Sequence, residues 1–321
     1  MDKKVIRLKE SSMCRFRPGF ISNDWLKLVM SFPDAFGRTG YDAFKKHDIV
    51  LVSKNERADL GFAKGISKVK GIPRSKCVLW RGEPPIYDVY FGPMLRNKSY
   101  LDEHLGVMSY YKDEYDCVRI SGPQNAFHYY NLYFRNVDRK LLCTVLTNKT
   151  ISVFINGFIF HDTKNHSLMG YRRYMDRVFC DNFEEDYVSY GRGWDSRCFK
   201  GKLREWTDMF KVLGQHKFAF VPENSSYSGY VSDKIINAMC CGAIPIYSGA
   251  PDVEDYIPKN CMLLTANYSE KELIRKIKNM SFSEYFRYRN NIRKFLTSKK
   301  TNIYSSYCFA EKIANIIEEN L

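Results

Sequence analysis

The chain has 321 residues, of which 45% are hydrophobic and 15% aromatic, and its formal net charge is +14. This composition excludes a globally disordered chain, and the length suits two α/β domains of about 150 residues each better than one core. The positive charge favours anionic partners such as nucleotides, nucleic acids, acidic lipids or acidic glycans, without choosing among them.

Short apolar runs predict buried parallel strands in the first part of the chain, at 48–53 (DIVLVS), 76–80 (KCVLW) and 115–120 (YDCVRI). We expect residues 1–139 to form a first α/β domain with irregular insertions. The first ten residues, MDKKVIRLKE, are charged and lack the apolar core of a signal peptide.

From residue 140 onward, predicted strands and helices alternate. The expected strands cover 140–149, 187–193, 217–223 and 243–249, and the expected helices cover 170–179, 202–216, 232–242, 269–280, 282–296 and 306–320. This alternation predicts a second domain at 140–300 built on a doubly wound parallel sheet, with 301–321 as a final helix that packs back on the first domain. Ligands of such sheets bind at the carboxyl ends of the strands.

One such carboxyl end is followed by a polar loop and a helix, in FVPENSSYSGYVSDK. Ser232 or Asp233 is a good N-cap, so the free N–H groups of the helix favour a phosphate. Lys234 in the first turn is unfavourable for the helix alone, and a bound anion would explain it. The Asp233 carboxylate can accept hydrogen bonds from ribose hydroxyls, and the Tyr230 ring can cover a sugar or base. Gly229 gives the loop backbone conformational freedom. The alternative is an ordinary cap with a surface lysine.

The segment from Lys217 to Pro251 resembles the donor-binding signature of the α-1,3-fucosyltransferases, glycosyltransferase family 10. The residues that match the family pattern are Lys217, Phe218, Glu223, Asn224, Tyr230, Val231, Ser232, Asp233, Lys234, Ala243, Ile244, Pro245, Ile246, Gly249 and Pro251. The resemblance implies that Tyr230 and Asp233 hold the ribose, that Lys234 pairs with the diphosphate, and that Ser232 belongs to the same donor-binding set. It implies that Glu223 and Asn224 contact the fucose or order the loop. Asp233 departs from the pattern, because the family usually has glutamate there.

Two further segments resemble the family. YRRYMDRV followed by SYGRG is similar to an arginine-bearing helix and turn, which implies that Arg173, or Arg172 in another register, contacts the diphosphate. Arginine suits that role because its planar fork pairs with phosphate oxygens. The alternative is a solvated basic helix face. LWRGEPPIYD, followed by LGVMSYYKDEYD, resembles the region of the proposed general base, which implies that role for Glu83. The alternative for Glu83 is a turn before two prolines.

The resemblance therefore implies the GT-B fold, in which two Rossmann-like domains face each other, with the acceptor on 1–139 and the GDP-sugar on 140–300. It implies inverting transfer of L-fucose from GDP-fucose to a glycan hydroxyl, with no metal and no further cofactor. The same scaffold with a different nucleotide sugar is the alternative, and residues 1–42 match no part of the pattern. Because the Lys and Arg residues are spread along the chain, we expect no nucleic-acid partner, whereas the basic surface allows a peripheral membrane contact.

Ten cysteines are scattered along the chain, without a CxxC pair or the Cys/His spacing of a zinc site. Cys240 and Cys241 are adjacent on a predicted helix, which is poor geometry for one disulfide. We therefore expect reduced core thiols. Together with the absence of a signal sequence or membrane-spanning run in this sequence, they predict a cytoplasmic protein, such as a bacterial or viral soluble form.

Overall fold

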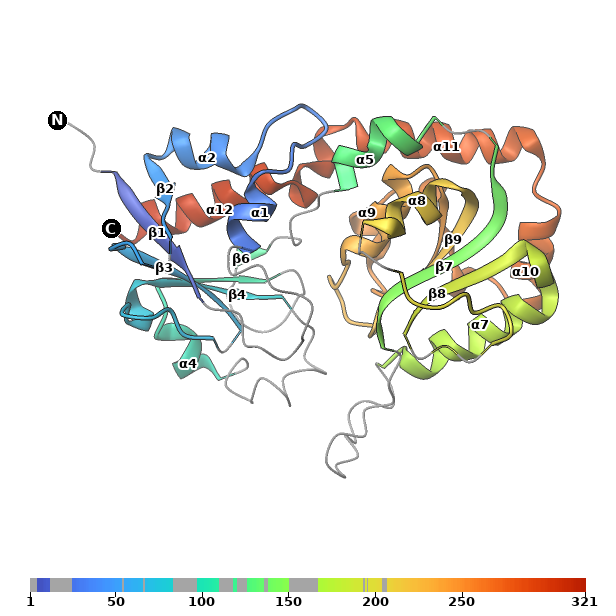
Figure 1. Ribbon diagram of the computed structural model, residues 1–321, viewed down its shortest axis with the longest axis horizontal. Coiled ribbons are helices and arrows are strands. Elements are labelled where there is room, and N and C mark those ends of the chain that lie inside the picture. The colour runs from blue at the N-terminus through green and yellow to red at the C-terminus, as the bar shows by residue number, and fades with distance from the viewer. Residues whose placement is uncertain are drawn as a thin grey trace, which may run out of the picture. The chain divides into compact units, whose positions relative to one another are not determined.

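The computed structural model divides the chain into two compact units, one made of 1–125 with 302–321 and the other of 126–301 (Figure 1). The residues that the structure describes are 5–11, 25–53, 55–65, 67–82, 97–109, 118–119, 126–135, 138–149, 167–192, 194, 196–203 and 207–321.

The first unit is built on a six-stranded parallel sheet with the order β2-β1-β3-β4-β5-β6. Its strands are β1 (Ile6–Glu10), β2 (Ile49–Leu51), β3 (Leu60–Lys64), β4 (Cys77–Arg81), β5 (Gly106–Ser109) and β6 (Val118–Arg119). Its helices are α1 (Trp25–Met30), α2 (Gly40–Lys46), α4 (Lys98–Asp102) and α12 (Ser306–Glu319). Helix α12 contacts α1, α2 and β4, and the ring of Phe309 packs edge-on against Phe62 and Trp80.

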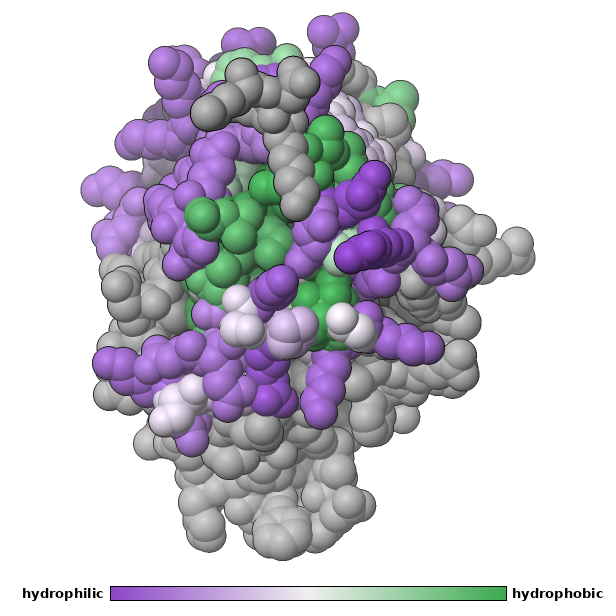
Figure 2. Space-filling view, turned by 90° about the vertical axis from the view of Figure 1, so that its left-hand side faces the viewer, coloured by the Kyte–Doolittle hydropathy of each residue, from purple (hydrophilic) through white to green (hydrophobic). Residues whose placement is uncertain are grey.

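The edge of the first sheet is short and partly apolar. The edge strand β2 has only three residues, and its Val50 is 44% exposed. Val5, directly before β1, is 48% exposed. Figure 2 shows apolar side chains gathered on the side of the molecule where these strands lie, with hydrophilic side chains around them. A short edge strand offers few unpaired backbone groups to another chain.

The second unit is built on a five-stranded parallel sheet with the order β11-β10-β9-β7-β8. Its strands are β7 (Lys140–Lys149), β8 (Tyr187–Arg192), β9 (His216–Pro222), β10 (Ile244–Ser248) and β11 (Leu263–Leu264). Its helices are α5 (Ala126–Tyr133), α7 (Met169–Phe183), α8 (Asp208–Gly214), α9 (Asp233–Cys240), α10 (Glu270–Lys278) and α11 (Phe282–Leu296). Read from β8, the strands follow the chain order 2-1-3-4-5, so the winding direction reverses between β7 and β9.

A buried arginine fixes the carboxyl ends of α5 and α9. The Arg139 Nη2 group donates to the carbonyls of Tyr133 at 2.7 Å and Cys241 at 2.8 Å, and its Nη1 donates to the carbonyl of His216 at 3.0 Å. Burial lowers the pKa of Arg139 to about 10, which still leaves it charged at neutral pH. Because the last carbonyls of a helix lack partners within the helix, this side chain holds α9 in place.

Acidification should destabilise the fold, because two buried histidines must gain protons on unfolding. Burial lowers the pKa of His104 and of His216 below 6.5, and their Nδ1 atoms lie 2.9 Å from the carbonyl of Tyr100 and 2.7 Å from that of Val212. Above the pKa of about 6.5 that these histidines have in the unfolded chain, they do not lower the free energy of unfolding. As the pH falls from there toward their lower pKa values in the folded protein, the free energy of unfolding decreases. Denaturant unfolding at several pH values should show this loss, and His104→Gln with His216→Gln should reduce it.

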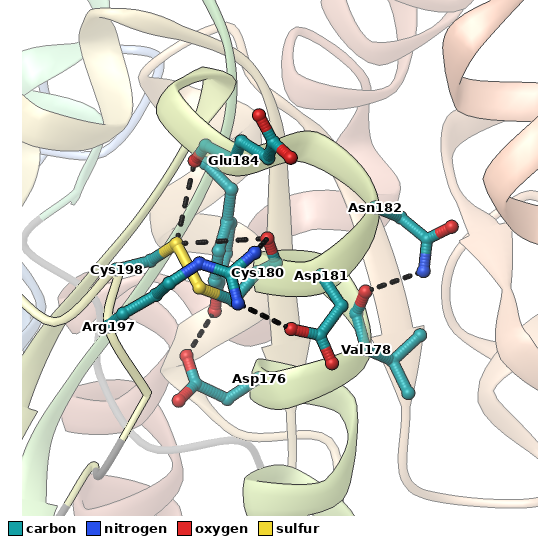
Figure 3. The surroundings of a disulfide bond; sticks show 9 residues. Asp176, Val178, Cys180, Asp181, Asn182, Glu184, Arg197 and Cys198 are labelled. Atoms are coloured by element: carbon teal, nitrogen blue, oxygen red, sulfur yellow. Dashed lines mark hydrogen bonds and ion pairs between the residues drawn. A yellow bond between two sulfur atoms is a disulfide. The ribbon is translucent and has the colours of Figure 1, made fainter.

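A disulfide joins Cys180 near the end of α7 to Cys198, 18 residues later in the sequence (Figure 3). The prediction that all the cysteines are reduced is therefore wrong for this pair, because residues distant in sequence meet where α7 packs beside the segment after β8. Cys240 and Cys241 are buried free thiols, and burial raises the pKa of both. Disulfides are typical of oxidising compartments, whereas a cytoplasmic protein was expected.

Reduction of the disulfide should lower the stability of the second unit. Closing a loop of this length restricts the unfolded chain by about 3 kcal/mol, which corresponds to roughly 5–10 °C in the melting temperature. The neighbouring ion pair between Arg197 and Asp181 is exposed, so it offers little compensation. Melting with and without a thiol reductant measures the effect. In the control variant Cys180→Ser/Cys198→Ser, the reductant should not change the melting temperature. An unchanged melting temperature of the wild type in reductant would contradict the prediction.

Within the described ranges, no helix is both long enough and apolar enough to cross a bilayer, and no three His, Cys, Asp or Glu side chains are grouped to hold a metal ion.

Candidate functional site

The polar loop singled out in the sequence lies where the winding of the second sheet reverses. Strand β9 ends at Pro222, next to β7, and the chain then passes through 223–232 into α9. In sheets of this order, ligands bind outside the carboxyl ends of the strands at this reversal. The loop therefore lies where the topology favours a binding site.

Glu223 is the centre of a buried network. Its side chain is completely buried, and its Oε1 accepts a hydrogen bond from the backbone N–H of Ser232 at 2.7 Å. Its Oε2 accepts from the Ser232 hydroxyl at 2.7 Å and from the Lys234 ammonium at 2.9 Å. Lys234 Nζ also donates to Ser232 Oγ at 2.7 Å. A buried carboxylate with three donors is satisfied, so the network fixes the start of α9.

The same contacts leave the N-terminus of α9 without a side-chain cap. Ser232 is the N-cap residue, but its hydroxyl serves Glu223 and makes no capping hydrogen bond to the helix. The first N–H groups of α9 therefore keep their capacity for an acceptor. The Lys234 side chain remains 23% exposed beside them. The part-exposed ammonium of Lys234, although paired with Glu223, and the unused N–H donors at the same helix start suit a phosphate-sized anion.

Two neighbouring arginines on α7 have different surroundings. Arg172 is buried, and its Nε donates to the carbonyl of Glu223 and its Nη2 to that of Pro222, both at 3.0 Å. Arg173 is partly exposed and, within the described part of the chain, has no hydrogen-bond or ion-pair partner. Arg172 therefore anchors the end of β9, whereas Arg173 is available to a ligand.

An aspartate that the sequence reasoning missed holds the loop. Asp252, just after β10, accepts hydrogen bonds from the Gly229 N–H at 2.7 Å and from the Ser228 hydroxyl at 2.5 Å. Gly229 has φ of +81°, a left-handed conformation that other residues rarely adopt. The only signal in the sequence was the position of Asp252 directly after the Gly-x-Pro of the matched pattern.

Gly249 is a second tight position. A Cβ atom there would lie 2.3 Å from the Tyr247 hydroxyl and 2.6 Å from Cγ of Glu223. The absence of a side chain therefore allows Glu223 to reach its buried place.

The remaining predicted residues occupy different environments. Asp233 is exposed at the first position of α9 and accepts from Asn237 Nδ2 at 3.1 Å. Tyr230 is only 2% exposed, so its ring does not present a face to solvent. Asn224 is partly exposed, and its buried Oδ1 has no hydrogen-bond partner among the described residues. Glu83 lies outside the described residues.

Comparison with known proteins agrees with the resemblance. Residues 189–319, which contain this loop and α9, match the family model for the C-terminal part of glycosyltransferase family 10 (fucosyltransferase). This part of the chain is therefore similar to the C-terminal part of the family 10 fucosyltransferases. GDP-fucose protein O-fucosyltransferase 3 of Danio rerio is 29% identical over 109 residues, 31% of this chain and 24% of that protein. α-(1,3)-Fucosyltransferase B of Drosophila melanogaster is 24% identical over 204 residues, 54% of this chain and 46% of that protein. The chain thus matches less than half the length of these two relatives.

Solved structures extend the likeness to the whole fold. A crystal structure of α1,3-fucosyltransferase with GDP aligns with 98% of this chain and 89% of that one, with a TM-score of 0.55 and 14% identity. An α-glucosyltransferase in complex with UDP and a 13-mer DNA aligns with 98% of this chain and all of that one, with a TM-score of 0.60 and 10% identity. These likenesses confirm the predicted GT-B fold class.

Proposed function

We propose that the protein is an inverting glycosyltransferase that transfers L-fucose from GDP-fucose to a hydroxyl of a glycan acceptor. The observation that carries this proposal is the uncapped start of α9, where Glu223 holds Lys234 beside unused helix N–H groups. This feature lies in the segment that matches the family 10 model. Relatives of the chain are called GDP-fucose protein O-fucosyltransferase 3 and α-(1,3)-fucosyltransferase B.

In the proposed donor site, different residues bind the diphosphate, bind the ribose and order the loop. Lys234 and Arg173 pair with the diphosphate and stabilise the charge that grows on its β-phosphate as GDP leaves. Asp233, exposed beside Lys234, binds the ribose, a role for which its side chain is one methylene shorter than the usual glutamate. Of the two roles expected for Glu223, the contacts favour ordering the loop, because its carboxylate is used by Ser232 and Lys234.

The transfer step needs a base on the acceptor side. Glu83 is proposed to take the proton from the acceptor hydroxyl while that oxygen bonds to the anomeric carbon of fucose. The bond from that carbon to the β-phosphate oxygen breaks on the opposite face, and GDP leaves with the electron pair. Protein cations neutralise the leaving group, so the step as proposed requires no metal. Asn224 remains a proposed donor contact, whereas the burial of Tyr230 favours support of the loop over direct cover of the sugar or base.

Calorimetric titration with GDP, GDP-fucose and UDP tests the donor. We expect GDP and GDP-fucose to bind and UDP to bind far more weakly. Preference for UDP and UDP-glucose would favour the same scaffold with a different nucleotide sugar, and absence of binding to every nucleotide would reject the donor site. A mixed glycan array, read by mass spectrometry for the addition of one deoxyhexose, then tests transfer.

Arg173→Ala and Arg172→Ala should separate ligand binding from folding. Arg173→Ala should weaken GDP binding roughly tenfold with little change in melting temperature, since it removes a charged contact to the diphosphate. Arg172→Ala should cost about 3 kcal/mol of stability, because two buried carbonyls lose their donor. Melting curves and calorimetry on both variants check this. If Arg172→Lys folds normally but no longer binds GDP, and Arg173→Ala still binds GDP, then Arg172 and not Arg173 is the residue that contacts the diphosphate.

A further inference from the structure

Although Lys and Arg residues occur throughout the chain, the excess of positive over negative charge is concentrated in one stretch of the second unit. Residues 271–300 contain ten Lys or Arg and two Asp or Glu, a net of +8, which leaves +6 for the other 291 residues out of the total of +14. This stretch forms α10, α11 and the residues up to η8 (Lys299–Tyr304). It lies outside the network around Glu223, so donor binding does not explain the charge.

The outward face of α11 is basic and carries no exposed carboxylate. Arg287, Arg293 and Lys294 are exposed on it, and the other polar side chains exposed along the helix, Ser283 and Asn290, are uncharged. The opposite face packs into the unit through residues including Tyr285, Ile292, Phe295 and Leu296. Helix α11 is thus amphipathic, with cations directed to solvent.

The single carboxylate of α11 does not neutralise this face. Glu284 is 21% exposed and forms a close ion pair with Lys276 of α10 at 2.6 Å. Its contact with Arg287 is long, at 3.5 Å, and the Arg287 side chain is 70% exposed. The guanidinium therefore still faces water.

A large aromatic side chain stands at the start of the same helix. Phe282 is 78% exposed, the highest exposure among the large hydrophobic residues that the structure describes, and its ring centroid lies 4.4 Å from that of Phe286. Leaving this ring in water has a cost that burial in a partner would remove.

We propose that α11 is a docking surface for membranes that contain acidic phospholipids. Arg287, Arg293 and Lys294 would contact the headgroups, and Phe282 would enter the interface between headgroups and acyl chains. This gives a defined place to the membrane contact expected from composition, and it does not depend on the identity of the sugar donor.

The shape of the surface favours a bilayer over a nucleic acid. Proteins that bind single strands place their cations along a groove and stack bases on aromatic side chains within it. Here the cations lie on the outward side of one packed helix, and the exposed aromatic stands at its end. A flat anionic surface can contact such a helix along its length, with the ring inserted at one end.

Co-sedimentation with lipid vesicles tests the proposal on the full chain. We expect binding to vesicles of phosphatidylcholine mixed with phosphatidylserine, weakening as salt is raised, and no binding to pure phosphatidylcholine. An Arg287→Gln/Arg293→Gln/Lys294→Gln variant should bind on the order of a hundredfold more weakly. Phe282→Ser should weaken binding to the mixed vesicles and leave its salt dependence unchanged.

A charge-matched control separates this surface from the net charge of the molecule. Lys68, Lys70 and Lys76 are exposed in the first unit, and their replacement by glutamine removes the same charge elsewhere. The proposal requires this control to bind like wild type, with all variants melting normally. It is overturned if wild type ignores acidic vesicles, if both triple variants lose binding equally, or if the α11 variant loses binding to single-stranded RNA but not to vesicles.

Discussion

Lys234→Ala should lower the affinity for GDP by about a hundredfold, because it removes the cation that we place on the diphosphate beside the N-terminus of α9. The same change should also lower the melting temperature. Without Lys234, the carboxylate of Glu223 stays completely buried and keeps only its two contacts with Ser232. An incompletely compensated buried charge is destabilising.

The two effects can be separated by a second substitution. In Glu223→Gln/Lys234→Ala the buried charge is gone, so the melting temperature should recover relative to Lys234→Ala, whereas GDP affinity should stay low. Lys211→Ala, an exposed lysine on α8 of the same unit, is the control and should change neither property. If the double variant regained GDP affinity, Lys234 would act only by neutralising Glu223.

Much of the second unit could be predicted from sequence because its segments carry strong local signals. The predicted strand at 140–149 and helix at 282–296 have the bounds of β7 and α11. The predicted helix at 202–216 was too long: α8 starts at Asp208 and ends at Gly214, although 204–206 lie outside the described residues. A helical pattern does not show where packing begins.

The first unit was harder because two of its strands carry weak patterns. Strand β1 lies in a stretch read as a charged N-terminus, since Arg7 and Lys9 alternate with Ile6 and Leu8. Strand β3 contains Gly61, a residue that weakens a strand prediction. In the fold a Cβ at Gly61 would lie 2.5 Å from the Cys77 sulfur, so close packing with β4 explains this glycine.

The site shows the same division between local and long-range information. The matched pattern identified Glu223, Ser232 and Lys234 as site residues. It did not show that Glu223 orders the other two, because that depends on a buried contact across nine to eleven residues. The choice between Arg172 and Arg173 was open for the same reason: adjacent helical residues point in different directions, and only packing shows which one is buried.

Glu83→Gln should reduce transfer by about 10²- to 10⁴-fold if Glu83 is the general base. The substitution keeps the size of the side chain and removes its capacity to hold the proton of the acceptor hydroxyl. Affinity for GDP should be unchanged, because the proposed donor contacts belong to the second unit. The acid limb of the pH–rate profile, which reports protonation of the base, should disappear in the variant.

Glu103→Gln is the matched control for this experiment. Glu103 is an exposed carboxylate of the same unit, paired with Arg74 at 2.6 Å, so its loss should leave transfer and its pH profile unchanged. If Glu83→Gln had a normal kcat, the general base would be another residue, and the proposed donor site would be unaffected. Loss of GDP affinity in Glu83→Gln would instead mean that this residue contributes to the donor site or to folding, a distinction that its melting temperature decides.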